Sequence, residues 1–169
     1  MAGDDQMDPA FLPMLLDPII DEEIGYTKGN RLTSLEAMKS MSPFRRFGNF
    51  ILTFMTKISS GYWNISDPQN GYTAISKRAL EKLNLDEIYP SYGYCNDILV
   101  KMNVVDVKVR DVAIPARYGN EKSKIKYSRY ITKLSWLLLK NYLWRLKMKT
   151  STQIGIFHSE NPKTLLQDE

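Results

Sequence analysis

At 169 residues, 43% of them hydrophobic and 25% charged, the chain is long enough to bury a core and has the composition of a folded globular domain. Its single cysteine, Cys95, excludes a disulfide scaffold, and no run reaches the ~18 uninterrupted apolar residues of a spanning helix. The net charge of +4 conceals an acidic start, residues 1–30, and a stretch at 122–149 with nine basic residues and no acidic one. This polarity indicates two partners, a cation and an anionic surface.

The first element in chain order is a helix. It is predicted by Asp8-Pro9, an N-cap followed by a proline at the first helical position. Pro18 is expected to end or kink this helix near Asp17. A short strand is expected over residues 24–28, running into a loop formed by Gly29, Asn30 and Arg31.

A second helix is predicted to begin at Ser42-Pro43 and to end at Ser60-Gly61. Its apolar side is predicted to be Phe47, Ile51, Phe54, Met55 and Ile58. The later elements are predicted as a loop over 66–71, a strand over 72–75, a helix over 77–83, a loop over 89–94, a helix over 96–102 and a strand over 104–114. Alternating helices and short strands favour an α/β fold.

The acidic stretch from Gly3 to Pro9 is the first candidate for chemistry. Mg²⁺ and Mn²⁺ prefer oxygen ligands, which carboxylates in a short loop supply. The alternative is an acidic segment that is merely solvated.

Three further clusters are candidates for a site. The first and the third carry cationic groups suited to an anion, and the first two have a plain turn as the structural alternative. The first is Lys28-Gly29-Asn30-Arg31, with Arg45 and Arg46 further along, where a guanidinium can hold a phosphate. The second is the polar loop Asp67–Tyr72, and the third the glycine loop Arg117–Lys124. Asp97 is either an N-terminal cap or a site carboxylate, and its local sequence favours neither.

The segment 126–149 is predicted to be a basic amphipathic helix at a membrane surface, followed by a fraying tail at 150–169. Its lysines form one stripe, and a different side carries apolar residues: Tyr127, Ile131, Leu134, Leu138 and Tyr142. Trp136 and Trp144 favour a water–lipid boundary. The alternative is a helix docked on the protein with a solvated lysine edge.

Taken in order, these clusters resemble glycosyltransferase family 2, in particular its polyprenyl-phosphate glycosyltransferases similar to dolichyl-phosphate mannose synthase. Residues 2–9 resemble the metal-binding Asp-x-Asp-x-Gln stretch, with Ala2 in place of the first aspartate and Asp4 and Gln6 at metal-contacting positions. Residues 28–31 resemble a Gly-Ser-Arg element whose arginine helps to hold the acceptor phosphate. Residues 67–72 resemble an Asp-x-x-Ser-Gly-Phe element, and residues 117–124 an Arg-x-x-Gly-x-Ser-Lys loop.

The resemblance implies sugar transfer from a nucleotide-sugar to a polyprenyl phosphate, with inversion and with Mg²⁺ or Mn²⁺. It implies a partial GT-A-type, Rossmann-like fold over residues 1–125 without its nucleotide-binding half, which in the family precedes the acidic motif. The implied site residues are these: Asp4 and Asp97 catalytic; Asp4 and Gln6 on the metal; Arg31, Arg45, Arg46, Asp67 and Asn70 at the acceptor phosphate; Arg117, Ser123 and Lys124 at the diphosphate loop.

The expected location is cytoplasmic and peripheral on an anionic membrane surface, because the start of the chain lacks the basic and apolar regions of a secretory signal. Two other functions remain open. One is a non-catalytic membrane-surface module or partner of a separate nucleotide-binding chain. The other is a nucleic-acid-binding domain, suggested by a pI of about 9.0 and by the basic, aromatic residues 117–149. Against nucleic acid, the basic residues form a helical stripe with an apolar opposite side, and no nucleic-acid-binding motif is present.

Overall fold

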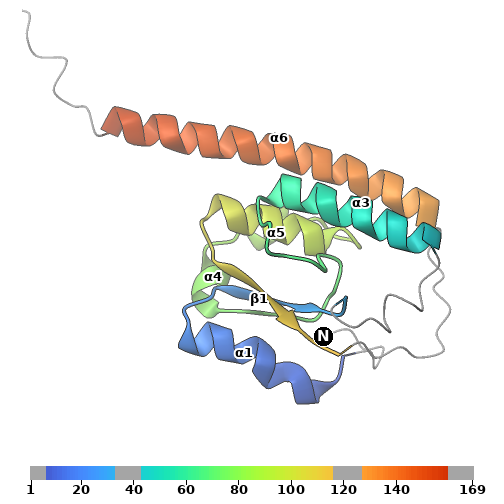
Figure 1. Ribbon diagram of the computed structural model, residues 1–169. Helices are drawn as coiled ribbons and strands as arrows, with labels where there is room; N and C mark the ends of the chain where they lie inside the picture. The colour runs from blue at the N-terminus through green and yellow to red at the C-terminus, as the bar shows by residue number, and fades with distance from the viewer. Residues whose placement is uncertain (1–6, 33–42, 116–126, 160–169) are drawn as a thin grey trace, which may run out of the picture.

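The computed structural model describes residues 7–32, 43–115 and 127–159, in which a small sheet is packed between helices (Figure 1). The elements are η1 (Pro9–Phe11), α1 (Leu12–Asp21), β1 (Tyr26–Asn30), α3 (Pro43–Ser60), β2 (Thr73–Ile75), α4 (Lys77–Glu81), η2 (Leu85–Glu87), α5 (Tyr94–Val104), β3 (Val109–Ala113) and α6 (Tyr127–Ser159). This arrangement confirms the α/β class.

The sheet has the order β2-β1-β3, with β1 antiparallel to β2 and parallel to β3. The loop expected at Gly29 and Asn30 is wrong, because both residues extend β1 by pairing with Val112 and Ala113 of β3. The last strand begins later than expected. Helix α5 continues to Val104, and the chain then turns through Asp106, whose φ is 53°.

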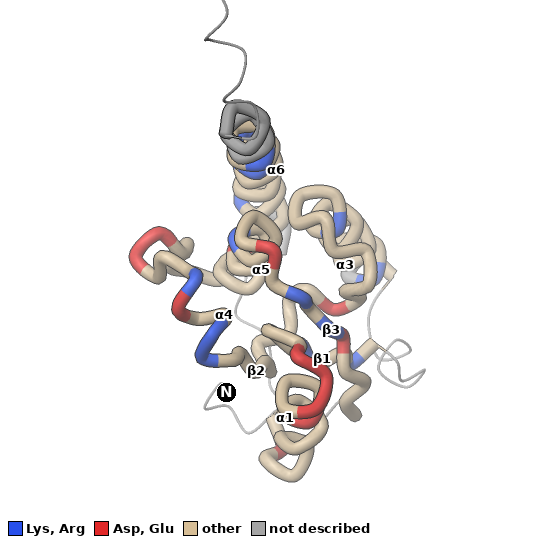
Figure 2. The backbone as a smooth tube through the Cα atoms, turned by 90° about the vertical axis from the view of Figure 1, so that its left-hand side faces the viewer, with Lys and Arg blue, Asp and Glu red and all other residues tan. Residues whose placement is uncertain are grey.

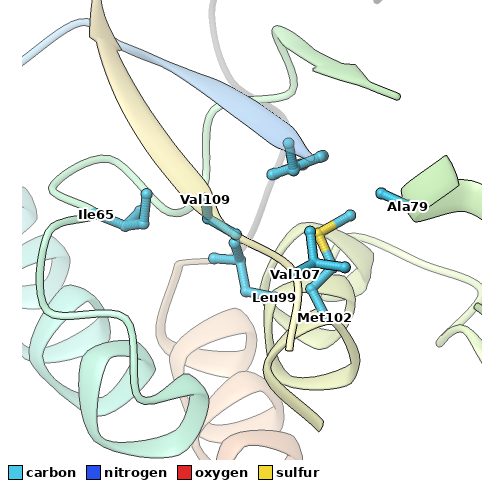
Figure 3. Close-up of a cluster of buried hydrophobic side chains, with 7 residues drawn as sticks. Ile65, Ala79, Leu99, Met102, Val107 and Val109 are labelled. Carbon is cyan, nitrogen blue, oxygen red and sulfur yellow. The ribbon is translucent and has the colours of Figure 1, made fainter. Parts of the chain in front are cut away.

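The two faces of the sheet carry different cores, as the alternation of side chains along a strand requires. On one face, Leu15 of α1 packs in a cluster with Val112, and Thr27 Oγ1 donates to the Leu15 carbonyl at 2.7 Å. On the other face, α5 supplies Leu99 and Met102 to a cluster that includes Val109 (Figure 3). Lys28 and Asp111, each at the middle of its strand, follow the strand alternation onto this α5 side.

Helix α1 starts as predicted but does not stop at Pro18. The Asp8 carboxylate accepts from the Ala10 N–H at 2.9 Å, which caps the short η1 turn that leads into α1. Pro18 lies inside the helix, which runs on to Asp21. Proline removes one backbone hydrogen bond, to the Met14 carbonyl, and Met14 lies on the exposed side of the helix.

Helix α3 has the predicted boundaries, but the expected apolar side is not the buried one. Its buried side runs through Gly48, Leu52 and Thr56, and Leu52 packs against α6. Phe47 and Phe54, expected on the apolar side, are exposed, whereas Met55 of the same expected side packs against the Leu52 cluster. Local periodicity finds an apolar stripe, but it cannot say which stripe meets the rest of the protein.

Helix α6 begins as predicted and continues to Ser159, past the expected boundary at Lys149. It lies alongside α3 and on α5, on the opposite side of the molecule from α1 (Figure 1). The side that was expected to face a membrane is packed instead, because Leu134 and Leu138 are buried against Leu52. For this side of the helix, the docked alternative is correct. None of the helices in the described residues has both the length and the hydropathy needed to cross a bilayer.

Candidate functional site

The candidate site lies at the carboxyl ends of β1 and β3, which meet at one edge of the sheet because the two strands are parallel. The loop from Asp67 to Gly71 folds back onto this edge just before β2 begins. Three of the residues predicted for the acceptor site, Arg31, Asp67 and Asn70, are therefore brought together from segments that lie far apart in the sequence.

An ion pair joins the end of β1 to this loop. Arg31 Nε donates to Asp67 Oδ2 at 2.9 Å, and Arg31 Nη2 approaches Asp67 Oδ1 at 3.4 Å. The Asp67 side chain is 6% exposed and that of Arg31 35%, so the carboxylate is sheltered while the guanidinium remains reachable from solvent. A carboxylate held in this way fixes the direction in which a guanidinium points.

Asn70 and Lys28 fasten the loop to β1. Asn70 Nδ2 donates to the Gly29 carbonyl at 2.8 Å, and Lys28 Nζ donates to the Asn70 carbonyl at 2.6 Å. Lys28 has no exposed surface, and burial lowers its pKa, although the nearby Asp67 and Asp111 carboxylates oppose the shift. A buried ammonium group thus ties together the residues that shape the site.

Asn30 and Asp111 make a second polar pair at the same edge. Asn30 Nδ2 donates to Asp111 Oδ2 at 2.7 Å, and the Ser66 N–H donates to the same oxygen at 3.1 Å. Burial raises the pKa of Asp111; the two hydrogen bonds counter the rise, and the neighbouring Asp67 adds to it. Ser66 directly precedes Asp67, so Asp111 helps to hold the loop in place.

The segment that precedes η1 also reaches this loop. Tyr72 Oη donates to the Asp8 carbonyl at 2.8 Å, and Met7 Cε would lie 3.2 Å from a Cβ added to Gly71. Residues 1–6 are outside the described residues, but they join the fold at Met7, beside the Asp67–Gly71 loop.

Asp97, predicted as a catalytic carboxylate, lies at the start of α5 in a network of its own. Its Oδ2 accepts from the Tyr89 N–H at 2.8 Å and from Lys101 Nζ at 2.5 Å, and its Oδ1 accepts from Asn141 Nδ2 of α6 at 2.7 Å. The carboxylate therefore connects α5, α6 and the loop before α5. Its catalytic role stays a prediction.

The other predicted site residues are placed only in part. Arg46 is exposed on α3, and Arg45 lies on the same helix with its side chain outside the described residues. Asp4 and Gln6, and the loop residues Arg117, Ser123 and Lys124, also lie outside them. Their predicted roles are neither supported nor contradicted.

Within residues 7–32, 43–115 and 127–159, no group of three or more histidine, cysteine, aspartate or glutamate side chains is placed to hold a metal ion. The two carboxylates of the described site, Asp67 and Asp111, are engaged by Arg31 and by Asn30 and Ser66.

Sequence reasoning missed Asp111, and it gave Lys28 no role of its own beyond its place in the cluster of residues 28–31. The available signal was the alternation of side chains along the two strands. Lys28 and Asp111 are direct Cα partners, and they lie on the side of the sheet on which Tyr26 and Val109 belong to the core. A charged pair on a core-facing side of a strand indicates a buried polar site. The register that pairs Lys28 with Asp111 could not be read from the sequence, because it depends on how the two strands meet in space.

No family model and no solved structure matches the chain. It is 29% identical over 115 residues to the UDP-N-acetylglucosamine–dolichyl-phosphate N-acetylglucosaminyltransferase of Methanococcus voltae, covering 65% of this chain and 45% of the relative. It is 27% identical over 116 residues to the uncharacterized protein MJ1222 of Methanocaldococcus jannaschii, covering 69% of this chain and 47% of that protein. The matches thus span about half the length of the two relatives, and they show this chain to be a partial homologue of a dolichyl-phosphate N-acetylglucosaminyltransferase.

Proposed function

We propose that this chain supplies the acceptor-phosphate part of an enzyme that transfers a sugar from a nucleotide-sugar to a polyprenyl phosphate. The observation that carries the proposal is the Arg31–Asp67 pair, held at the edge of the sheet beside the point where the acidic segment joins the fold. The similarity to a dolichyl-phosphate sugar transferase supports it. The three-stranded sheet is compatible with part of a GT-A-type, Rossmann-like fold.

Arg31 binds the acceptor phosphate in this proposal, and Asp67 is its positioning residue. A guanidinium recognises phosphate through paired N–H donors, which requires that its plane be held in one orientation. Asp67 provides that orientation, and Asn70 and Lys28 keep the loop that carries Asp67 against β1. Arg46, which is exposed on α3, is proposed as a second contact to the same phosphate.

Asp4 and Gln6 are proposed to hold Mg²⁺ or Mn²⁺ at the donor diphosphate. Chain connectivity limits the Asp4 Cα to about 11 Å from that of Met7, because consecutive Cα atoms are about 3.8 Å apart. Met7 lies beside Gly71, so the donor and acceptor groups fall within reach of one edge of the sheet. When bound, the ion would neutralise charge on the departing nucleotide.

The reaction needs no strong base, because a phosphate monoester is already ionised near neutral pH. Arg31 aims one phosphate oxygen at the anomeric carbon of the sugar, and a single displacement inverts that carbon while the nucleoside diphosphate leaves. Arg117, Ser123 and Lys124 are proposed to contact the diphosphate.

Binding of farnesyl phosphate, a short and soluble polyprenyl phosphate, tests the acceptor role directly on this chain. Calorimetry of the Arg31→Ala variant should show about a tenfold or greater loss of affinity, since a charge-assisted bond to phosphate is removed. The affinity of the Arg31→Lys variant should lie between that of the unaltered chain and that of Arg31→Ala. Arg78→Ala, which removes an exposed arginine of α4, is the matched control and should bind as the unaltered chain does. Equal losses for Arg31→Ala and Arg78→Ala would reject the acceptor role.

Transfer itself is tested by joining this chain to the part of the Methanococcus voltae relative that it does not cover. The hybrid should transfer N-acetylglucosamine from UDP-N-acetylglucosamine to dolichyl phosphate and should lose turnover when Asp4 or Arg31 is replaced by alanine. Unchanged turnover in both variants would show that the assigned roles are wrong.

A further inference from the structure

Tyr94, the first residue of α5, reaches the candidate site from another part of the fold. Its helix lies between the sheet and α6 (Figure 2). A Cβ added to Gly71 would lie 3.2 Å from Tyr94 Oη and 3.2 Å from Met7 Cε. Because Gly71 has no side chain, the tyrosine hydroxyl and Met7, where the acidic segment joins the fold, both lie against the Asp67–Gly71 loop.

Solvent reaches the polar groups at this edge to different extents. Lys28 has no exposed surface and the Asp67 side chain is 6% exposed, whereas Tyr94 is 45% exposed and the Arg31 side chain 35%. The hydrogen bonds of the two buried groups hold the loop in shape. Tyr94 and Arg31 carry donors that a ligand in solution can reach.

The packing of α5 fixes the place of Tyr94. The Tyr94 N–H donates to the Ser91 carbonyl at 2.8 Å, which closes the turn before the helix. Three residues further on, the Asp97 carboxylate accepts from the Tyr89 N–H at 2.8 Å and from Asn141 Nδ2 of α6 at 2.7 Å. A side chain carried by a helix that is held in this way is suited to contact a ligand with little loss of conformational freedom.

The Tyr94 hydroxyl keeps its proton at neutral pH. A hydrogen bond with the Cys95 thiol, together with partial burial, raises the pKa of Tyr94 to about 12. Cys95 is buried, and a thiol is only a weak hydrogen-bond partner. The phenol is therefore a neutral donor whose proton can go to a stronger acceptor, such as a phosphate oxygen.

The hydroxyl and the Arg31 guanidinium approach the same short piece of backbone. The Gly29 N–H donates to the Tyr72 carbonyl at 2.8 Å, so Gly71, which precedes Tyr72, lies beside Gly29. Arg31 follows Gly29 by two residues, which corresponds to about 7 Å along a strand. A phosphate placed between the two side chains can accept from both, because it has several oxygens.

We infer that Tyr94 is a further binding residue for the acceptor phosphate, to which its hydroxyl donates a hydrogen bond. The inference rests on the proposed function, since it concerns the phosphate that Arg31 binds. Arg31 supplies the charge, and Tyr94 supplies a neutral donor from a helix that is distant from Arg31 in the sequence. Two donors from separate elements fix the direction of the remaining phosphate oxygens better than one does.

The Tyr94→Phe variant tests this contact, because it keeps the ring and removes only the hydroxyl. Calorimetry should show about tenfold weaker binding of farnesyl phosphate, as expected for the loss of one hydrogen bond to a charged oxygen. Tyr92→Phe, at a 70% exposed position in the loop before α5, is the matched control and should bind as the unaltered chain does. The urea concentration at the midpoint of unfolding should be the same for both variants and the unaltered chain.

A spectroscopic readout separates contact from a merely structural role. Farnesyl phosphate should shift the near-ultraviolet absorption of the unaltered chain and of Tyr92→Phe, since the Tyr94 phenol changes its hydrogen-bond partner. The Tyr94→Phe variant should lack this shift.

Three results would overturn the inference: unchanged affinity in Tyr94→Phe, an equal loss in Tyr92→Phe, or a loss in Tyr94→Phe that comes with a lower urea midpoint and an unchanged absorption shift. The Arg31→Ala variant keeps this test apart from that of the proposed function. If Arg31→Ala weakens binding and Tyr94→Phe does not, the acceptor role stands and only the Tyr94 contact is rejected. If Arg31→Ala binds normally, the acceptor role itself is rejected.

Discussion

Lys28 Nζ donates to the backbone carbonyl of Asn70 at 2.6 Å, although no part of the Lys28 residue is exposed. The bond crosses from the central strand to the loop that carries Asp67, and the Asp67 and Asp111 carboxylates lie near enough to counter part of the lowering that burial imposes on the pKa of Lys28. The conformation of the Asp67–Gly71 loop thus depends on a lysine side chain that has no exposed surface.

Replacing Lys28 by methionine keeps the length of the side chain and removes its charge and its hydrogen bond. We expect the free energy of unfolding at pH 7 to fall by about 2–3 kcal/mol, because the Asn70 carbonyl loses its donor and two carboxylates lose a compensating cation. These losses outweigh the relief of removing a desolvated charge. Urea denaturation measures the change.

The loss of stability in the Lys28→Met variant should depend on pH. Burial lowers the pKa of Lys28, so the unfolded chain holds this proton more tightly than the folded one between the lowered and the ordinary lysine value. The contribution of Lys28 to the free energy of unfolding therefore rises with pH between these two values. The Lys28→Met variant lacks this rise. The deficit of the variant should be larger at pH 10 than at pH 7, and a deficit that shrinks would contradict this account.

The change in stability caused by Asp111→Asn should depend on pH in the opposite sense to that caused by Lys28→Met. Because burial raises the pKa of Asp111, the folded chain holds this proton more tightly, and the stability contributed by Asp111 falls as pH rises from its ordinary value through the raised one. An asparagine oxygen accepts the bonds from Asn30 and Ser66 without ionising. Between pH 4 and pH 7 the variant should therefore gain stability relative to the unaltered chain. Asp86→Asn, at an exposed position in η2, should show no such gain.

The parts of the fold that the sequence predicts correctly are those decided by neighbouring residues. Asp8 caps the turn it precedes, and α3 stops at Ser60 because Gly61 takes up a φ of 77° that other residues rarely adopt. The predictions that failed depend on partners distant in the chain. Phe47 and Phe54 are as apolar as Leu52, and only the position of α6 decides that Leu52 is the buried one.

The candidate site was predictable as a set of residues but not as a geometry. The glycine, asparagine and arginine of residues 29–31 and the polar loop at 67–71 are visible in the sequence. Their contact depends on how β1 pairs with β2 and β3, which follows from packing in three dimensions and not from local pattern. For the same reason the supporting roles of Lys28 and Asp111 emerge only once the register is known.

Two substitutions of Asp97 separate a structural from a catalytic role. Asp97→Ala should lower the free energy of unfolding by about 3 kcal/mol, since it leaves Lys101 and Asn141 without their buried partner. Asp97→Asn keeps the size of the side chain and an acceptor oxygen, so it should cost about half as much. If the same Asp97→Asn substitution abolished sugar transfer by the hybrid enzyme while barely changing stability, the carboxylate would be catalytic.

Substitutions of Gly61 and Arg145 test how α6 is held against the rest of the protein. Arg145 donates from Nη2 to the Ile58 carbonyl at 2.9 Å, and a Cβ added to Gly61 would meet Arg145 Nη1 at 2.5 Å. Gly61→Ala should cost about 2 kcal/mol from the left-handed backbone and this clash, and Arg145→Met about 1–2 kcal/mol from lost hydrogen bonds. Once Arg145 is methionine, no guanidinium opposes the new methyl group, so the double variant should lose less stability than the two single losses added together. Strict additivity in urea denaturation would mean that Arg145 does not pack against Gly61 in solution.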